Sequence, residues 1–187
     1  MIVLTLLISG YSKRFGQNKL FYPVEGKAMY LNVLEMLEKT AKNNPLTADV
    51  AVVSRFEEVK AECEKRGITY IQNNESQNGM SASIIAAVKN INAEYIMFFA
   101  GDMPYIKRKT VECFLKAFLA SKKGIGCVKT DGIYTIPAVF SGKYTNELLA
   151  LRGDSGARKI IERHGGDVFS FDAQSKEFRD IDTPSEL

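Results

Sequence analysis

Short apolar stretches alternate with longer amphipathic stretches along most of this chain. The apolar stretches are rich in β-branched residues and are bounded by Gly, Asn or Asp; they cover residues 2–8, 48–54, 68–73 and 94–102. Stretches of this length and composition predict strands that are buried on both faces.

The segments between these strands carry the helical repeat. The predicted helices cover residues 29–43, 57–67, 81–91 and 108–124. The first has one apolar face, formed by Leu31, Leu34, Leu37 and Ala41. Gly67 is placed to end the second as a C-cap. Regular strand–helix alternation predicts a parallel sheet with helices on both faces.

The pattern changes after residue 124. A strand, a turn at Asp131-Gly132 and a second strand follow, which predicts one antiparallel strand. A last helix is expected near 155–164 and a last strand over 167–172. The fold class predicted is therefore three-layer α/β with a mostly parallel, Rossmann-like sheet. With 187 residues and neither a repeat nor a linker, residues 1–187 are expected to form a single domain.

The amino-acid composition limits the classes of binding partner and the cellular compartment that we expect. A formal net charge of +3, with acids and bases mixed, lacks the basic stripe expected of a nucleic-acid-binding protein. No stretch reaches the roughly 18 apolar residues of a membrane helix, and the first residues lack the charged start of a signal peptide. The sparse cysteines Cys63, Cys113 and Cys127 predict neither disulfides nor a zinc site. We expect a soluble cytoplasmic protein that binds a small anionic substrate.

The loop after the first strand is the strongest candidate for anion binding. Gly10 and Gly16 frame a segment in which Ser12 and Arg14 can donate to phosphate, and Lys19 follows. Neither the Walker A pattern nor G-x-G-x-x-G is present. The open alternative is a solvated basic turn.

Asp102 is the last residue of the predicted strand over residues 94–102 and directly follows "FFAG". Ligands bind beyond the carboxyl ends of strands in such sheets, and Mg²⁺ takes one or two carboxylates plus substrate phosphates. The alternative is that Asp102 caps the next element. Likewise, the start of the helix near Gly79 and Ser81 could bind anions through its free N–H groups, or Ser81 could simply be its N-cap.

Five motifs in order resemble the MobA-like nucleotidyltransferases, whose signature begins L-A-A-G-x-S-x-R-M-G-x-x-K. On that pattern fall Leu7, Gly10, Ser12, Arg14, Gly16, Lys19 and Gly26. "NGMSASIIAAV" (78–88), "AGDMP" (100–104), "RGDSGARKII" (152–161) and "DIDTPSEL" (180–187) match the later motifs. The last two are most similar to those of molybdenum cofactor cytidylyltransferases.

The resemblance implies a Mg²⁺-dependent enzyme that joins an NTP, here CTP, to a phosphate-bearing acceptor such as molybdopterin and releases pyrophosphate. It assigns Arg14 and Lys19 to the triphosphate, and Asp102 to Mg²⁺ with Asp182 as a second ligand or a structural residue. The residues that would frame base and ribose are Leu7, Ser9, Gly10, Ser12, Gly16, Gly79, Ser81 and Ser83. Asp154 and Arg158 would lie toward the acceptor.

Two alternatives stay open. Cytidylyl members usually have L-A-A-G and guanylyl members L-A-G-G in the first loop, whereas residues 7–10 are L-I-S-G. GTP or another NTP, and a sugar or polyol phosphate acceptor, are therefore alternatives within the same enzyme class. The second alternative is a chaperone that binds nucleotide or cofactor without turnover and delivers it to a molybdenum enzyme.

Overall fold

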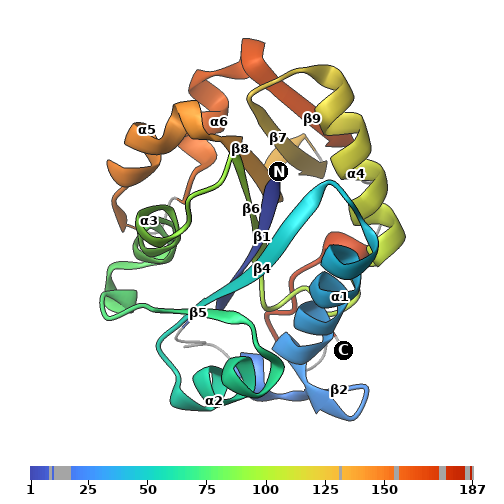
Figure 1. Cartoon of the computed structure of the whole chain (residues 1–187), viewed down its shortest axis with the longest axis vertical. Coiled ribbons are helices and arrows are strands. Elements are labelled where there is room, and N and C mark those ends of the chain that lie inside the picture. The colour runs from blue at the N-terminus through green and yellow to red at the C-terminus, as the bar shows by residue number, and fades with distance from the viewer. Residues whose placement is uncertain are drawn as a thin grey trace.

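A seven-stranded sheet forms the centre of the molecule, with strand order β5-β4-β1-β6-β8-β7-β9 (Figure 1). This computed structural model describes residues 1–8, 10, 18–130, 132–153, 156–172, 176–183 and 186. The strands of the sheet are β1 (Ile2–Ile8), β4 (Thr47–Ser54), β5 (Thr69–Gln72), β6 (Tyr95–Ala100), β7 (Ile125–Thr130), β8 (Ile133–Ser141) and β9 (Val168–Asp172).

Of these strands, β8 runs against the others. It is antiparallel to both of its neighbours, β6 and β7, whereas the pairs β1–β4, β1–β6, β4–β5 and β7–β9 are parallel. A short turn can join only antiparallel strands, and β7 and β8 are connected through Gly132, whose φ is 80°. The mostly parallel sheet with one antiparallel strand is thus confirmed; Asp131 of the predicted turn lies outside the described residues.

Helices cover both faces of the sheet (Figure 1). One face carries α1 (Met29–Asn43), α2 (Glu57–Arg66) and α4 (Arg108–Ser121). The other carries α3 (Met80–Asn90), α5 (Thr145–Leu149) and α6 (Arg158–Arg163). The three-layer α/β class is confirmed.

Strand β1 is buried on both faces because its side chains alternate between two cores. Leu4, Leu6 and Ile8 belong to the core under α1 and α4, whereas Val3 and Leu7 belong to the core under α3 and α6. Successive side chains of a strand point to opposite faces of the sheet. Because each face of β1 meets an apolar core, apolar residues are needed at consecutive positions, which explains the continuous apolar stretch in the sequence.

The predicted face of α1 is partly wrong. Leu34 and Leu37 are buried as expected, but Leu31 and Ala41 are only half-buried. The buried positions of this helix are Met29, Tyr30, Val33, Leu34, Met36, Leu37 and Thr40. The apolar stripe is wider than the leucine spacing alone indicates, and its centre is rotated toward Val33.

The predicted end of α2 is confirmed, whereas the predicted end of α4 is wrong. Gly67 ends α2 with a φ of 68°. Helix α4 was expected to reach residue 124 but ends at Ser121, because Lys122 adopts the left-handed conformation with a φ of 56°. The short helix α5 and the hairpin of β2 (Pro23–Val24) and β3 (Lys27–Ala28) were not predicted from the sequence.

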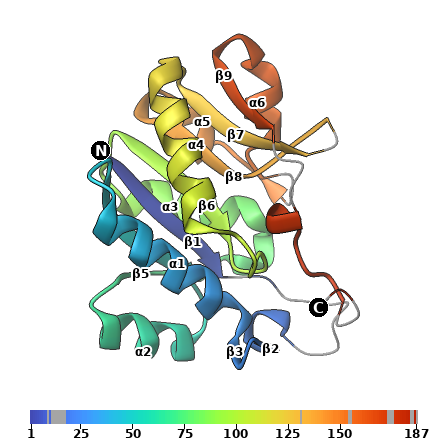
Figure 2. The same ribbon diagram turned by 90° about the vertical axis from the view of Figure 1, so that its right-hand side faces the viewer.

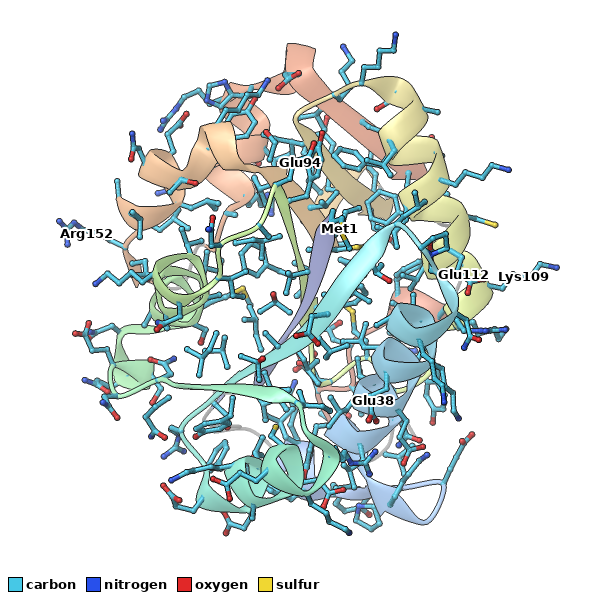
Figure 3. The ribbon with its side chains drawn as sticks, viewed as in Figure 1. Met1, Glu38, Glu94, Lys109, Glu112 and Arg152 are labelled. Atoms are coloured by element: carbon cyan, nitrogen blue, oxygen red, sulfur yellow. The ribbon has the colours of Figure 1, made fainter. Side chains whose placement is uncertain are left out.

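The end of the sheet where β1 begins is closed by an ion pair. The N-terminal amino group of Met1 lies 2.7 Å from the Glu94 carboxylate, which precedes β6, and Figure 3 shows the two residues side by side. In the part of the chain that the structure describes, no helix is both long and apolar enough to cross a membrane.

Candidate active site

The candidate site begins where β1 and β6 end. The amide of Gly101 donates to the carbonyl of Leu7 at 3.3 Å, so the chain stays against β1 for one residue beyond β6. A Cβ at Gly101 would lie 3.3 Å from Leu20 Cδ2, which keeps this turn close to the following segment. Asp102 therefore lies just beyond the carboxyl edge of the sheet, as predicted.

Lys19 joins two segments that are distant in sequence. Its ammonium lies 2.8 Å from Asp102 Oδ2 and 2.8 Å from Asp182 Oδ1, and its side chain is only 14% exposed. It belongs to the 3₁₀ turn η1 (Lys19–Phe21), where the Asn18 side chain accepts from the amide of Leu20. Since Leu20 is buried in the core, the backbone that carries Lys19 is anchored.

The C-terminal segment completes this cluster. Figure 2 shows residues 176–183 (red) leading down the molecule toward the β2–β3 hairpin. The amide of Ile181 donates to the carbonyl of Asp102 at 3.0 Å, and the Ile181 side chain packs with Val24 and Met29. These contacts place Asp182 opposite Asp102.

Electrostatics couple the groups of the cluster. Burial lowers the pKa of Lys19, but the charges and hydrogen bonds of Asp102 and Asp182 outweigh it, so that the pKa lies above its ordinary value. Partial removal from water raises the pKa of the neighbouring Asp180, and the charges of Asp102 and Asp182 raise it further. Asp102, Asp180 and Asp182 therefore form an acidic cluster beside the Lys19 ammonium.

The same carboxylates fit a divalent cation. Asp102 Oδ1 is buried and has no hydrogen-bond partner among the described residues, which leaves an oxygen available to a cation. Within the described ranges, no group of three or more His, Cys, Asp or Glu residues could hold a metal by itself. Mg²⁺ suits such a site, because it uses one or two carboxylates and takes further oxygens from phosphates.

The start of α3 contributes Gly79, which is its N-cap with a φ of 84°. The interpretation of Ser81 as the cap is wrong: its hydroxyl donates instead to the carbonyl of Asn78 at 3.4 Å. The Ser83 hydroxyl accepts a hydrogen bond from the side-chain amide Nδ2 of Asn73 at 2.9 Å. Both serines are buried, so their hydroxyls stabilise the connection between β5 and α3.

A cavity of about 230 Å³ lies between α3, β8 and α6. It brings Leu7, predicted on the nucleotide side, close to Arg158, predicted on the acceptor side. Its walls are mainly apolar and include Met80, Ile84, Phe98, Ile136 and Ile161. Arg158 is held by Glu162 at 2.8 Å and is the one charged side chain among the described residues that line the cavity.

Several predicted site residues lie outside the described residues: Ser9, Ser12, Arg14, Gly16 and Asp154. Gly10 is described and exposed, and a Cβ there would meet no atom within 4 Å.

Sequence reasoning missed two residues near this edge. Asp180 belongs to the C-terminal motif but was not singled out, although its charge is coupled to Asp102. Arg55 directly follows β4 and its guanidinium lies 4.3 Å from the centre of the Phe56 ring. Its place at the carboxyl end of a strand is the kind of signal that also pointed to Asp102, which lies two residues beyond β6.

The comparison with models of protein families shows which family this chain belongs to. The MobA-like NTP transferase domain matches residues 4–168. This chain belongs to that family. The family expected from the sequence motifs is therefore confirmed.

Two proteins of similar sequence carry different functional names. A probable molybdenum cofactor guanylyltransferase of Aquifex aeolicus is 31% identical over 146 residues, covering 76% of this chain and 65% of that protein. The purine catabolism protein PucB of Bacillus subtilis is 28% identical over 194 residues, covering 96% of this chain and 91% of that protein. The match thus spans less than two thirds of the first relative (65%) and most of the second (91%).

Solved structures share the fold. A nucleotidyl transferase from Methanothermobacter has a TM-score of 0.81 at 17% identity, covering 100% of this chain and 94% of that chain. The Rv0371c protein of Mycobacterium tuberculosis, solved in complex with manganese, has a TM-score of 0.72 at 18% identity, covering 92% of this chain and 88% of that chain.

Proposed function

We propose that this MobA-like NTP transferase is a metal-dependent enzyme that joins an NTP to the phosphate of a small acceptor. The observation that carries this proposal is the meeting of Lys19, Asp102 and Asp182 at the carboxyl edge of the sheet, with Nζ–Oδ distances of 2.8 Å. Phosphoryl chemistry needs positioning and charge neutralisation more than a protein nucleophile, and this cluster offers both.

The charge of each side chain in the cluster suggests its role in the reaction. Asp102 and Asp182 would hold a divalent cation, Mg²⁺ in our proposal, which would neutralise charge on the phosphates when bound. Lys19 and Arg14 would bind the triphosphate and stabilise the departing pyrophosphate. In the transfer, an oxygen of the acceptor phosphate bonds to the α-phosphorus of the NTP, and the bond from that phosphorus to pyrophosphate breaks.

The remaining residues would form the two halves of the substrate site. Leu7, Gly10 and Gly79 would contact the base and ribose, with Ser9, Ser12 and Gly16 in the first loop. The buried hydroxyls of Ser81 and Ser83 would shape this pocket through the backbone of α3. Arg158, from the edge of the cavity, and Asp154 would lie toward the acceptor.

Molybdopterin is the acceptor that we propose, because relatives are named as molybdenum cofactor enzymes. The cytidylyl-type motifs in the sequence favour CTP. The name of the Aquifex aeolicus relative, a probable molybdenum cofactor guanylyltransferase, favours GTP, which is the second candidate. Delivery of the product to a molybdenum enzyme would follow.

A pyrophosphate-release assay tests the proposal. Each of CTP, GTP, ATP and UTP is incubated with the protein, Mg²⁺ or Mn²⁺, and molybdopterin. We expect release with one nucleotide, CTP or GTP, only when both metal and acceptor are present. Pyrophosphate release with a sugar or polyol phosphate, but not with molybdopterin, would show that the acceptor is of that class. Nucleotide binding with no turnover on any acceptor would favour the chaperone alternative.

A further inference from the structure

The ammonium of Lys19 occupies the space between the two proposed metal ligands. It is 2.8 Å from an oxygen of Asp102 and 2.8 Å from an oxygen of Asp182, and the Lys19 and Asp102 side chains are both largely buried. Both carboxylates therefore already share one cation. A divalent cation that uses the same carboxylates must compete with this ammonium, because two cations at such distances repel each other.

In the proposed reaction, Lys19 also binds the triphosphate. Its ammonium therefore has a second place to go when a nucleotide is bound. Its backbone is fixed by the buried Leu20 and by the Asn18 cap, whereas the four-carbon side chain can turn without moving the fold. A triphosphate carries more negative charge than the two carboxylates that now hold the ammonium. Arrival of a nucleotide would thus draw Lys19 away from Asp102 and Asp182.

We propose that Lys19 is an exchangeable counter-ion that closes the metal site until a nucleotide arrives. Metal alone binds weakly, because Lys19 holds its ligands. When the nucleotide takes the ammonium, the carboxylates become available, so metal and nucleotide bind together. This inference rests on the proposed use of Asp102 and Asp182 as metal ligands.

The test measures Mn²⁺ binding to the whole chain without nucleotide, by electron paramagnetic resonance of free Mn²⁺. Lys19→Met removes the charge and keeps the apolar stem, and we expect it to tighten Mn²⁺ binding by about tenfold or more. Lys19→Arg keeps the cation and should bind Mn²⁺ as weakly as the wild type. Asp102→Asn added to Lys19→Met should remove the gain.

A matched control separates competition from a general charge effect. Arg179 pairs with Glu186 at 3.1 Å in the same C-terminal segment, but it does not lie between the two carboxylates. Arg179→Met should therefore change Mn²⁺ affinity by less than about threefold. Circular dichroism confirms that each variant is folded.

Two results would overturn the inference. One is equal Mn²⁺ affinity of Lys19→Met and the wild type; the other is an equal gain in Arg179→Met. A second measurement adds an NTP analogue that cannot be cleaved: it should tighten Mn²⁺ binding to the wild type by a larger factor than to Lys19→Met. No acceptor is used, so a failure of pyrophosphate release would contradict the proposed function and leave this result intact.

Discussion

At the scale of single residues, Asp102 shows what a strand end contributes. It lies two residues beyond β6, and one of its oxygens pairs with Lys19 while the other is buried with no partner among the described residues. A carboxylate held in this way has one oxygen that protein groups do not use. The proposed metal role explains why this oxygen is left without a hydrogen bond.

Replacement of Asp102 by Asn tests that role. The amide keeps the size of the side chain but loses its charge, so we expect metal-dependent pyrophosphate release to fall by about 100-fold or more. Asp172→Asn, at the exposed end of β9, is the control and should leave the rate nearly unchanged. Near-normal turnover in the Asp102 variant would contradict the proposal that Asp102 is a metal ligand.

At the scale of elements, the contact between α4 and the sheet depends on a glycine in β7. A Cβ at Gly126 would lie 2.6 Å from Phe118 Cδ2 and 2.8 Å from Val139 Cγ1. Helix α4 approaches the sheet this closely only because β7 has no side chain there. On the outer face of α4, Lys109 points away from the sheet (Figure 3).

Gly126→Ala should therefore overpack this contact and lower the free energy of unfolding by about 1–3 kcal/mol. Urea denaturation measures the change. Gly142→Ala is the control, since the nearest atom to a Cβ there is Glu94 O at 3.8 Å. Equal stability of the two variants would show that α4 can move away from the sheet at little cost.

Asp167 connects three elements near β9. It lies in the turn η5 (Gly165–Asp167) and accepts from the Gly124 amide at 3.1 Å, from the Tyr144 hydroxyl and from the Lys143 ammonium. Burial raises the pKa of Asp167, but these hydrogen bonds and the charge of Lys143 outweigh it and lower the pKa to about 2. The carboxylate therefore stabilises the folded state when it is ionised.

This stabilisation should depend on pH. The unfolded chain, with an ordinary pKa near 3.8, takes up the proton before the folded chain does, so the contribution is complete above about pH 5 and is lost as pH falls toward 2. Asp167→Asn should cost about 1–2 kcal/mol at pH 7, and about half of that difference should remain at pH 3. Urea denaturation at both pH values measures it, and a pH-independent difference would contradict the assignment.

At the scale of the whole molecule, one sheet separates two cores. The core on the side of α1 includes Leu37, and the core on the side of α3 includes Ile84. Both cores use side chains of β1 and β6, so loss of packing on one face weakens the strands that carry the other.

We therefore predict a single cooperative unfolding transition, as expected for one domain. Leu37→Ala and Ile84→Ala should each cost about 2–5 kcal/mol. In both variants, far-UV and near-UV circular dichroism should give the same transition midpoint. Two separate midpoints would show that the faces unfold independently and would overturn the single-domain prediction.

The sequence by itself determined the family and most of the elements. Apolar stretches of strand length, helical spacing and Gly67 predicted the sheet and its main helices, because these signals act over a few neighbouring residues. The motifs around Lys19 and Asp102 identified the family for the same reason: each is local, and their order along the chain is specific.

Only the tertiary structure decided which groups meet. Lys19, Asp102 and Asp182 come from three distant segments, and their 2.8 Å contacts depend on how the C-terminal segment returns past β6. The local pattern of residues also could not show that Ser81 and Ser83 are turned inward, or that the buried face of α1 is centred near Val33. Side-chain direction and long-range pairing depend on packing between elements, and packing is a property of the assembled molecule.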